Sequence, residues 1–295
     1  METLEGLKRR IESTEDLQSV VKTMKSLAAV KIRQYQKAVE AVEEYNKTVV
    51  KGLQAVLYGW PDTRGGSADE SGNRLGAVIF GSDQGMCGQL NDQVASYAVE
   101  AMENQNVRPD HRHILSVGQR MTARLESQEQ FPEESFSLPN SVHGITGKVR
   151  ELLLRIESWT DVQGLDRIFL FYSRPTSGAS FKPHSVRLLP VDRHWLADIK
   201  ENPWPTAMLP LYTMERGLLF SKLIRQYLFV SLFRAFADSA ASENASRLAS
   251  MQRAEGNIKE QLDDLNKRYH MQRQMSITEE LLDIVSGFEA LTNAS

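Results

Sequence analysis

The stretch LQSVVKTMKSLAAVKIRQYQKAVEAVEEYNKTVVKGLQAV, residues 17–56, contains no proline, and apolar residues recur along it at helical spacing. The mean step between those apolar residues is about 3.5 residues, which is the repeat of a coiled-coil seam. Gly59, Trp60 and Pro61 follow, and glycine and proline are typical just past the end of a helix. We therefore expect a helix from Leu4 to Leu57, on the order of 80 Å long. The seam positions are Leu17, Val21, Met24, Ala28, Ile32, Tyr35, Val39, Val42, Tyr45, Val49, Leu53 and Val56.

The C-terminal part of the chain has the same character. All ten prolines lie between Pro61 and Pro210, and apolar spacing resumes at Leu218 and continues to Leu291. Because proline inside a helix costs about 3 kcal/mol, two long proline-free flanks favour two long helices around a separate domain. The two ends of an inserted domain lie close together, so the helices are expected to pair antiparallel. The second helix, residues 211–291, is the longer one, and one of its ends should project beyond its partner.

The seam of the second helix changes character twice. Around Asn244 it becomes small and polar, over residues 239–247, and at Ile277 the apolar frame shifts. A polar break in a seam fixes register or marks a site, and the alternative is a locally solvated helix. The shifted apolar positions are Ile277, Leu281, Ile284, Phe288 and Leu291.

Between the flanks, short apolar runs alternate with helical stretches, which is typical of a small α/β domain with a largely parallel sheet. The sequence thus predicts three parts, a helix at 1–60, an α/β domain with its linkers at 61–210, and a helix at 211–295. The expected strands are residues 75–80, 114–117, 168–172 and 186–191. The expected helices are 91–102, 119–126 and 148–159. A polar linker at 62–73 and a surface loop at 174–183 complete the pattern.

Composition excludes several classes of protein. The 295 residues are 41% hydrophobic and 25% charged, as in soluble folded proteins, and no apolar run approaches a membrane span. The only cysteine is Cys87, so an internal disulfide is excluded. With no export or transit signal at the N-terminus, the cytosol is expected. The net charge of −3 argues against a general nucleic-acid binder.

A search for chemistry finds one candidate motif, GSDQGMCGQLN at residues 81–91, which follows a predicted strand. Glycine-rich turns there often bind phosphate, but a tight turn packed through Gly85 and Gly88 is the favoured interpretation. Cys87 is expected to be a buried, inert thiol. His111 and His113 alone do not indicate a metal site. No catalytic residue, cofactor or metal is therefore expected.

The first helix carries five bases and no acid between Leu17 and Lys37, namely Lys22, Lys25, Lys31, Arg33 and Lys37. A solvated face is the ordinary interpretation of such a run, and a docking strip for an acidic partner is the alternative. Ala28 and Ala29 in this region would permit close approach by a neighbouring element.

Three segments together resemble one known family. The first segment, KTMKSLAAVKIRQYQKA at residues 22–38, is similar to the N-terminal helix of the gamma subunit of F-type ATP synthases. The second, residues 81–91, resembles the strand–turn signature of that family, and the third, residues 242–291, resembles its C-terminal helix. The resemblance implies a non-catalytic rotor shaft inside a ring of alpha and beta subunits. Its base would contact the c-subunit ring and the epsilon subunit. It also implies a peripheral location on the cytoplasmic side of a bacterial plasma membrane, with no cofactor and no nucleic acid.

The resemblance further implies which residues contact the alpha/beta ring. Met24 and Lys25, with Lys31 and Arg33 of the basic strip, match the region that meets the acidic lever of the beta subunits. Arg247 matches an arginine that faces the ring. The zone gripped by the beta subunits corresponds to Arg273, Gln274, Thr278, Glu279 and Glu280.

Three departures from the family pattern stand out. LYTM at residues 211–214 replaces LYEP, Gln84 replaces an arginine, and Arg253 stands near the usual lysine. These departures leave open a second, divergent ATPase of the same cell. Two other classes compete with the rotor, a coiled-coil adaptor or clamp, and a nucleotide- or RNA-binding module. Few aromatic residues accompany the bases, so single-strand stacking is poorly supported.

Overall fold

The computed structural model describes residues 3–59, 74–105, 107–176, 180–204, 206, 208 and 210–292. It divides into two compact units, Met1–Leu27 with Leu248–Ser295, and Ala28–Arg247. The two longest helices contribute to both units. In chain order the elements are α1 (Leu4–Leu57), β1 (Leu75–Phe80), α2 (Leu90–Glu103), the 3-10 turn η2 (Pro109–His111), β2 (Arg112–Val117), α3 (Gln119–Glu126), β3 (Glu134–Phe136), α4 (Val142–Asp161), β4 (Arg167–Pro175), β5 (Phe181–Leu189), α5 (Arg193–Glu201) and α6 (Arg216–Thr292).

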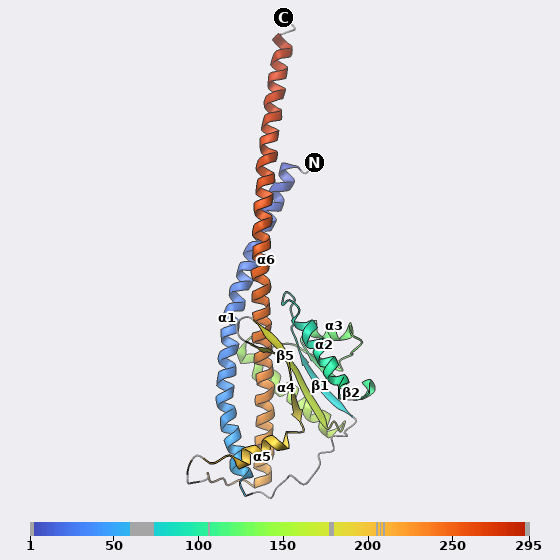
Figure 1. Cartoon of the computed structure of the whole chain (residues 1–295), viewed down its shortest axis with the longest axis vertical. Helices are drawn as coiled ribbons and strands as arrows, with labels where there is room; N and C mark the ends of the chain where they lie inside the picture. The colour runs from blue at the N-terminus through green and yellow to red at the C-terminus, as the bar shows by residue number, and fades with distance from the viewer. Residues whose placement is uncertain are drawn as a thin grey trace. The chain divides into compact units, whose positions relative to one another are not determined.

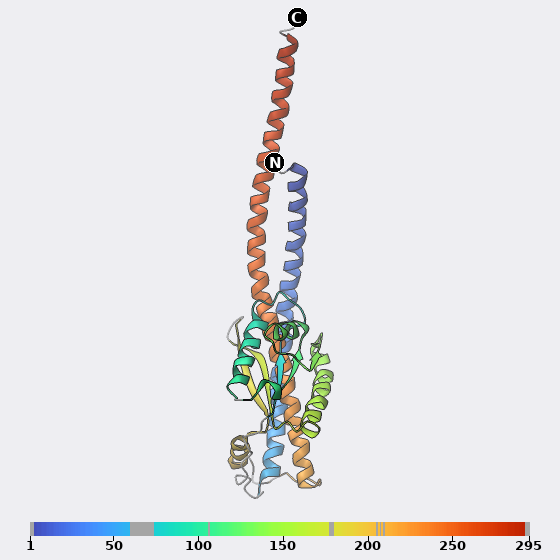
Figure 2. The same ribbon diagram turned by 90° about the vertical axis from the view of Figure 1, so that its right-hand side faces the viewer.

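Within the larger unit, α1 and α6 lie side by side and run antiparallel (Figures 1 and 2). Glu43 pairs with Arg234 at 2.9 Å, and Tyr45 donates a hydrogen bond to Gln226 at 3.1 Å. Further along α1, a methyl group on Gly52 would meet the side chain of Leu223. As the residue number increases along α1, the residue number of its partner in α6 decreases, which confirms the antiparallel pairing.

The two helices also contact each other within the smaller unit. Lys25 of α1 contacts Glu255 of α6 at 2.6 Å, and Leu7, Met251 and Leu265 are buried between the helices. Beyond Leu265, α6 runs on past the N-terminus of the chain (Figure 2), and large apolar side chains stand exposed along it. They are Met271, Met275, Ile277, Leu281, Leu282, Ile284 and Val285.

The seam predicted for α1 is wrong at two positions, Leu17 and Tyr45, both of which are exposed. Leu17 is 55% exposed, whereas Leu7 and Thr14 are buried and Gln18 and Val21 are half-buried. The face that meets α6 therefore includes polar positions, which a count of apolar residues passes over. A second row of exposed apolar residues on α1 results, formed by Leu17, Val20, Leu27 and Val30.

The central domain is a five-stranded sheet in the order β3-β2-β1-β4-β5, with only β5 antiparallel to its neighbour. The largely parallel sheet was predicted and is confirmed. Apolar residues of α2 and α3, such as Val94 and Met121, pack on one face of the sheet. Those of α4 and α6 pack on the other, where Phe236 meets Phe80 edge-on at 4.9 Å between ring centroids. The second long helix is therefore a structural layer of the domain.

Several boundaries differ from the sequence prediction. The structure adds β3 and α5, extends β4 to Pro175, and starts β5 at Phe181, inside the segment predicted as a loop. β3 has only three residues, and β5 is an edge strand, where proline such as Pro183 is tolerated. α4 begins at Val142, six residues before the predicted start. The prediction missed these first turns because they contain glycines at 144 and 147, which are poor helix formers.

Some predictions stay predictions. The linker at 62–73 and the helix-ending Trp60 and Pro61 lie outside the described residues, although Gly59 has a φ of 68°, as is common just past a helix. The domain limits 1–60, 61–210 and 211–295 also remain predictions. Among the described residues, the structure contains no helix with the length and apolar character of a membrane span.

Candidate functional site

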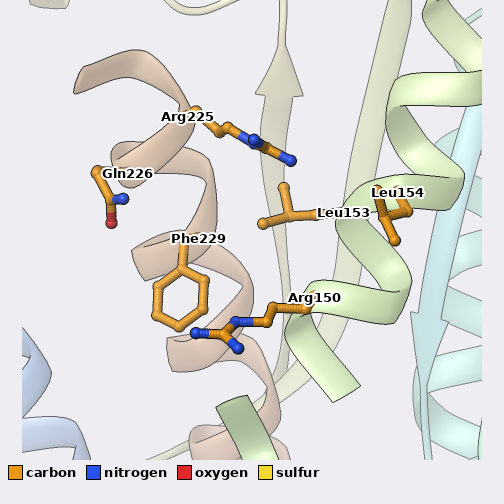
Figure 3. Close-up of a pocket in the computed structure, with 6 residues that line it drawn as sticks. All are labelled: Arg150, Leu153, Leu154, Arg225, Gln226 and Phe229. Atoms are coloured by element: carbon orange, nitrogen blue, oxygen red, sulfur yellow. The ribbon is translucent and has the colours of Figure 1, made fainter. Parts of the chain in front are cut away.

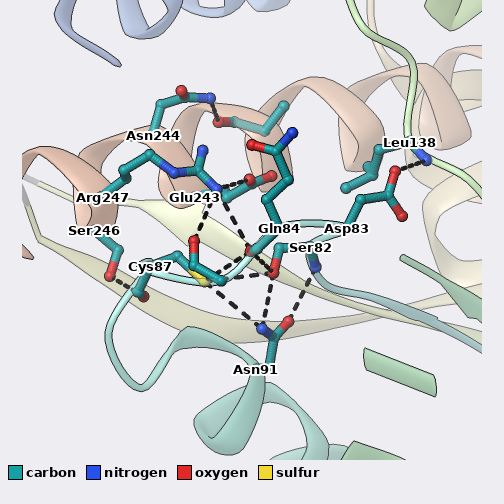
Figure 4. A network of polar contacts seen from close by, with 12 residues as sticks. Ser82, Asp83, Gln84, Cys87, Asn91, Leu138, Glu243, Asn244, Ser246 and Arg247 are labelled. Carbon is teal, nitrogen blue, oxygen red and sulfur yellow. Dashed lines mark hydrogen bonds and ion pairs between the residues drawn. The ribbon is translucent and has the colours of Figure 1, made fainter. Parts of the chain in front are cut away.

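The glycine-rich turn at residues 81–91 is held together by Asn91, the second residue of α2. Its side-chain oxygen accepts a hydrogen bond from the Ser82 N–H at 3.0 Å, and its amide nitrogen donates to Ser82 Oγ at 2.8 Å. Ser82 Oγ in turn donates to the carbonyl of Gln84 at 2.9 Å. Figure 4 shows these contacts converging on Ser82 and Cys87. Cys87 is buried, as expected of an inert thiol.

Asp83 makes the phosphate interpretation unfavourable. Its carboxylate accepts hydrogen bonds from the backbone N–H of Gln119, at 3.0 Å, and of Leu138, at 2.8 Å. Gln119 is the first residue of α3, so Asp83 binds the N-terminus of that helix and also places a carboxylate within the glycine-rich turn itself, where it would repel an anion. The turn is therefore structural.

The expected reason for the glycines needs correction. A methyl group on Gly85 would meet nothing nearer than Arg120, at 3.8 Å, so close packing does not require glycine there. The tight positions are Gly81, where it would lie 2.5 Å from Asn91 Oδ1, and Gly118, which the sequence did not single out. Gly88 has a φ of 60° and serves the turn through its backbone conformation.

The polar segment of α6 packs on this turn. Ser242, Glu243, Asn244, Ser246 and Arg247 are all buried, which overturns the locally solvated alternative. Ser246 donates a hydrogen bond to the carbonyl of Cys87, and Ser242 donates to the carbonyl of Ser173 in β4 at 3.1 Å. Asn244 bonds back to Ala240 within the helix. We call residues 82–91 together with 242–247 the polar junction.

The ion pair in the polar junction joins Glu243 to Arg247 at 2.6 Å, with side chains only 11% and 9% exposed. Arg247 also lies 3.4–3.5 Å from the carbonyl oxygens of Gln84 and Gly85. Burial raises the pKa of Glu243, and Arg247 opposes that rise. Burial, and then the charge of Glu243, raise the pKa of Tyr35 in α1. The hydrogen bonds of the junction therefore join α6 to the turn after β1.

Replacing Asn91 by alanine should lower the free energy of unfolding by about 1–3 kcal/mol, because the buried N–H of Ser82 loses its acceptor. Thermal or urea unfolding would measure the change. Gln93→Ala, in the same helix but outside the hydrogen-bond network of the turn, is the control. Equal stability of the two variants would contradict a structural role for Asn91.

The residues expected to contact a partner fall into three groups. Lys22, Lys31, Arg33 and Lys37 are exposed on α1, whereas Met24 and Lys25 are half-buried and Lys25 is paired with Glu255. The second group lies on α6 and consists of Arg273, Gln274, Thr278, Glu279 and Glu280. All five of these side chains are exposed. Arg247 stands apart, because the polar junction encloses its side chain.

The histidines form no metal site. His113 bonds to Glu133 through Nδ1, and Glu133 also accepts from Arg155 and Trp159. Across the described ranges, no cluster of three potential metal ligands occurs.

The profile of one protein family, described as ATP synthase, matches residues 3–291. The chain belongs to this family. It is 27% identical to the ATP synthase gamma chain of Rhizobium rhizogenes over 99% of this chain and all of that relative. It is 28% identical to the gamma chain of Bacteroides fragilis, over 97% of this chain and 99% of that one.

Solved structures agree on the fold. A chain in the Euglena gracilis mitochondrial ATP synthase, in a structure of OSCP, F1 and the c-ring, matches with a TM-score of 0.70. The match is 19% identical and covers 98% of this chain and 94% of that one. A chain in a Tetrahymena thermophila central stalk and c-ring structure matches with a TM-score of 0.55 and 20% identity, covering 80% of this chain and 99% of that one.

Two of the three residues or segments that depart from the expected family pattern have exposed side chains. The Gln84 side chain is exposed, and the polar junction uses only its backbone carbonyl. Arg253, a second departure, is exposed on α6, where it bonds to Ala249 and Ser250. Neither departure disturbs the buried contacts.

Proposed function

We propose that this chain is the gamma-type rotor subunit of a membrane F-type ATP synthase or ATPase, a non-catalytic shaft. It would couple ion flow through a c-subunit ring to nucleotide catalysis in a ring of alpha and beta subunits. The observation that carries the proposal is the family match from residue 3 to residue 291, with gamma chains as relatives matched over nearly their whole length.

The physical construction suits a shaft. A helix can transmit torque from a domain only if the helix cannot turn within that domain. Here α6 is a layer of the domain core, and the polar junction adds directional contacts between α6 and the loop after β1. Rigid packing of this kind transmits a displacement in discrete steps.

The proposed contacts with the alpha/beta ring are those expected from the sequence. Met24, Lys25, Lys31 and Arg33 would meet an acidic lever, and the α6 residues Arg273, Gln274, Thr278, Glu279 and Glu280 would be gripped by the beta subunits. Arg247 would contact the ring only through the small part of its side chain left exposed. The epsilon subunit and c ring would bind the base, on the cytoplasmic side of a bacterial plasma membrane.

Native mass spectrometry of this chain co-expressed with the alpha and beta subunits of its own organism tests the proposal. We expect three alpha, three beta and one copy of this chain, with ATPase activity in the same sample. Self-association, or a ring that forms without this chain, would favour the adaptor alternative and reject the rotor.

Replacing Arg273 and Gln274 together by alanine should weaken assembly or coupling by about tenfold or more, because charged hydrogen bonds are worth roughly 1.5–3 kcal/mol each. Both side chains are exposed, so the melting temperature of the isolated chain should not change. The matched control is Arg108→Ala with Asp110→Ala, an exposed ion pair on the α/β domain. Equal assembly of both double variants would argue against this contact zone.

A further inference from the structure

A pocket of about 310 Å³ lies between α4 and α6 on the central domain, and none of its lining residues belongs to the polar junction or to the predicted ring contacts. Figure 3 shows its construction. Arg225 reaches from α6 toward α4, and Arg150 reaches from α4 toward α6, where its guanidinium ends beside the ring of Phe229. Leu153 and Leu154 line the α4 side. The pocket thus has an apolar centre with a guanidinium on each side.

The two arginines differ in charge balance. Arg225 pairs with Glu157 of α4 at 2.8 Å, which largely neutralises it. The side chain of Arg150 makes no hydrogen bond or ion pair with any described residue. The neighbouring acid on α4, Glu151, is already paired with Lys148 at 2.8 Å. The pocket therefore offers one uncompensated guanidinium, a group that binds carboxylates through two parallel hydrogen bonds.

The apolar centre is only partly covered by the chain itself. Leu154 is 61% exposed although it lies one turn from Arg150 on the same helical face. Leu153 is buried in the domain core, and Phe229 packs against Phe233 with 6.3 Å between ring centroids. An apolar side chain placed on Leu154 would remove it from water. A methyl group added at Gly147, one turn before Arg150 on α4, would meet nothing within 4 Å.

We propose that this pocket binds a peptide segment of another subunit of the complex, in which an apolar side chain stands next to an aspartate or glutamate. The carboxylate pairs with Arg150 and the apolar side chain covers Leu154. Charge complementarity selects an acidic segment, because the acids beside the pocket are paired and Arg150 is not. The inference rests on the proposed function for the source of the partner, and adds the site and its chemistry.

The test places the photoreactive amino acid benzoylphenylalanine at Leu154 in the complete membrane complex and identifies the cross-linked peptide by mass spectrometry. A second preparation carries it at Val162, an exposed site just after α4 and outside the pocket lining. We expect Leu154 to cross-link to one subunit segment that contains an acid next to an apolar residue. Arg150→Glu should lower that yield by about tenfold or more, and leave the Val162 products unchanged.

Two further measurements test whether Arg150→Glu acts through the pocket and not by unfolding the chain. Arg150 is exposed and unpaired among the described residues, so Arg150→Glu should leave the melting temperature unchanged, and changing the partner's acid to lysine should restore the cross-link. No product at Leu154, a product with lipid or with a segment lacking acids, or a yield insensitive to Arg150→Glu would each overturn the proposal. Native mass spectrometry of the same sample separates these results from a failure of the chain to enter the complex, which would reject the proposed function as well.

Discussion

Replacing Arg247 by methionine is expected to lower the free energy of unfolding by about 3–5 kcal/mol, the cost of leaving a buried charge without its partner. Arg247 and Glu243 are only 9% and 11% exposed, and the methionine side chain cannot replace the guanidinium beside the carboxylate or the carbonyls of Gln84 and Gly85. Urea unfolding of the isolated chain would measure the loss.

The matched control is Arg268→Met. Arg268 pairs with Asp264 four residues earlier in the same helix, as Arg247 does with Glu243, but these side chains are 61% and 57% exposed. Exposed helical pairs contribute about 0.3–0.5 kcal/mol, so the control should lose at most about 1 kcal/mol. Similar losses for the two variants would contradict a special role for the buried pair.

The pH dependence of Arg247→Met gives a second readout. Burial holds the pKa of Glu243 above its usual value near 4.5, and Arg247 opposes that effect. Because Arg247→Met removes the opposing charge, the pKa of Glu243 should be higher still in the variant. An acid with a raised folded-state pKa stabilises the fold fully below its unfolded pKa and loses that contribution as pH rises through the folded pKa. The difference in the free energy of unfolding between the wild type and Arg247→Met should therefore become smaller as pH falls from 7 toward 4.5. Glu243→Gln combined with Arg247→Met should show no such narrowing.

Replacing Gly118 by alanine should cost about 3 kcal/mol or more. Gly118 has a φ of 109°, which side chains rarely adopt, and its new methyl group would lie 2.7 Å from the backbone carbonyl oxygen of Ser82. That backbone cannot move freely, because the Ser82 carbonyl accepts a hydrogen bond from Arg120 N–H at 2.9 Å and the Ser82 N–H is bound by Asn91. Thermal unfolding followed by circular dichroism would report the loss.

Gly164→Ala is the comparison for a positive φ without a close contact. Gly164 also has a positive φ, of 63°, but nothing lies within 4 Å of an added methyl group. Only the conformational cost remains there, about 1–2 kcal/mol. If Gly118→Ala proved no worse than Gly164→Ala, the close approach of Ser82 would not constrain this turn.

The sequence predicted the parts of this protein that depend on local periodicity. The two long helices, their antiparallel pairing and the strand at 75–80 follow from proline placement and apolar spacing. β3 and β5 were missed or misplaced because a three-residue strand and a proline-bearing edge strand owe their existence to neighbours in the sheet. No pattern in the sequence predicted the pocket between α4 and α6, because the residues that line it from the two helices are about 75 positions apart in the chain.

By itself the sequence determined the helix–domain–helix plan and the family resemblance, because both are written in residues close together along the chain. Only the tertiary structure decided that residues 242–247 are buried, that Leu17 is exposed and that Gly118 is constrained. Each of these depends on a partner far away in sequence. Ser246 bonds to Cys87, and Gly118 lies against Ser82. A polar segment is solvated or buried according to whether such a partner can satisfy its hydrogen bonds, and only the folded chain brings that partner into place.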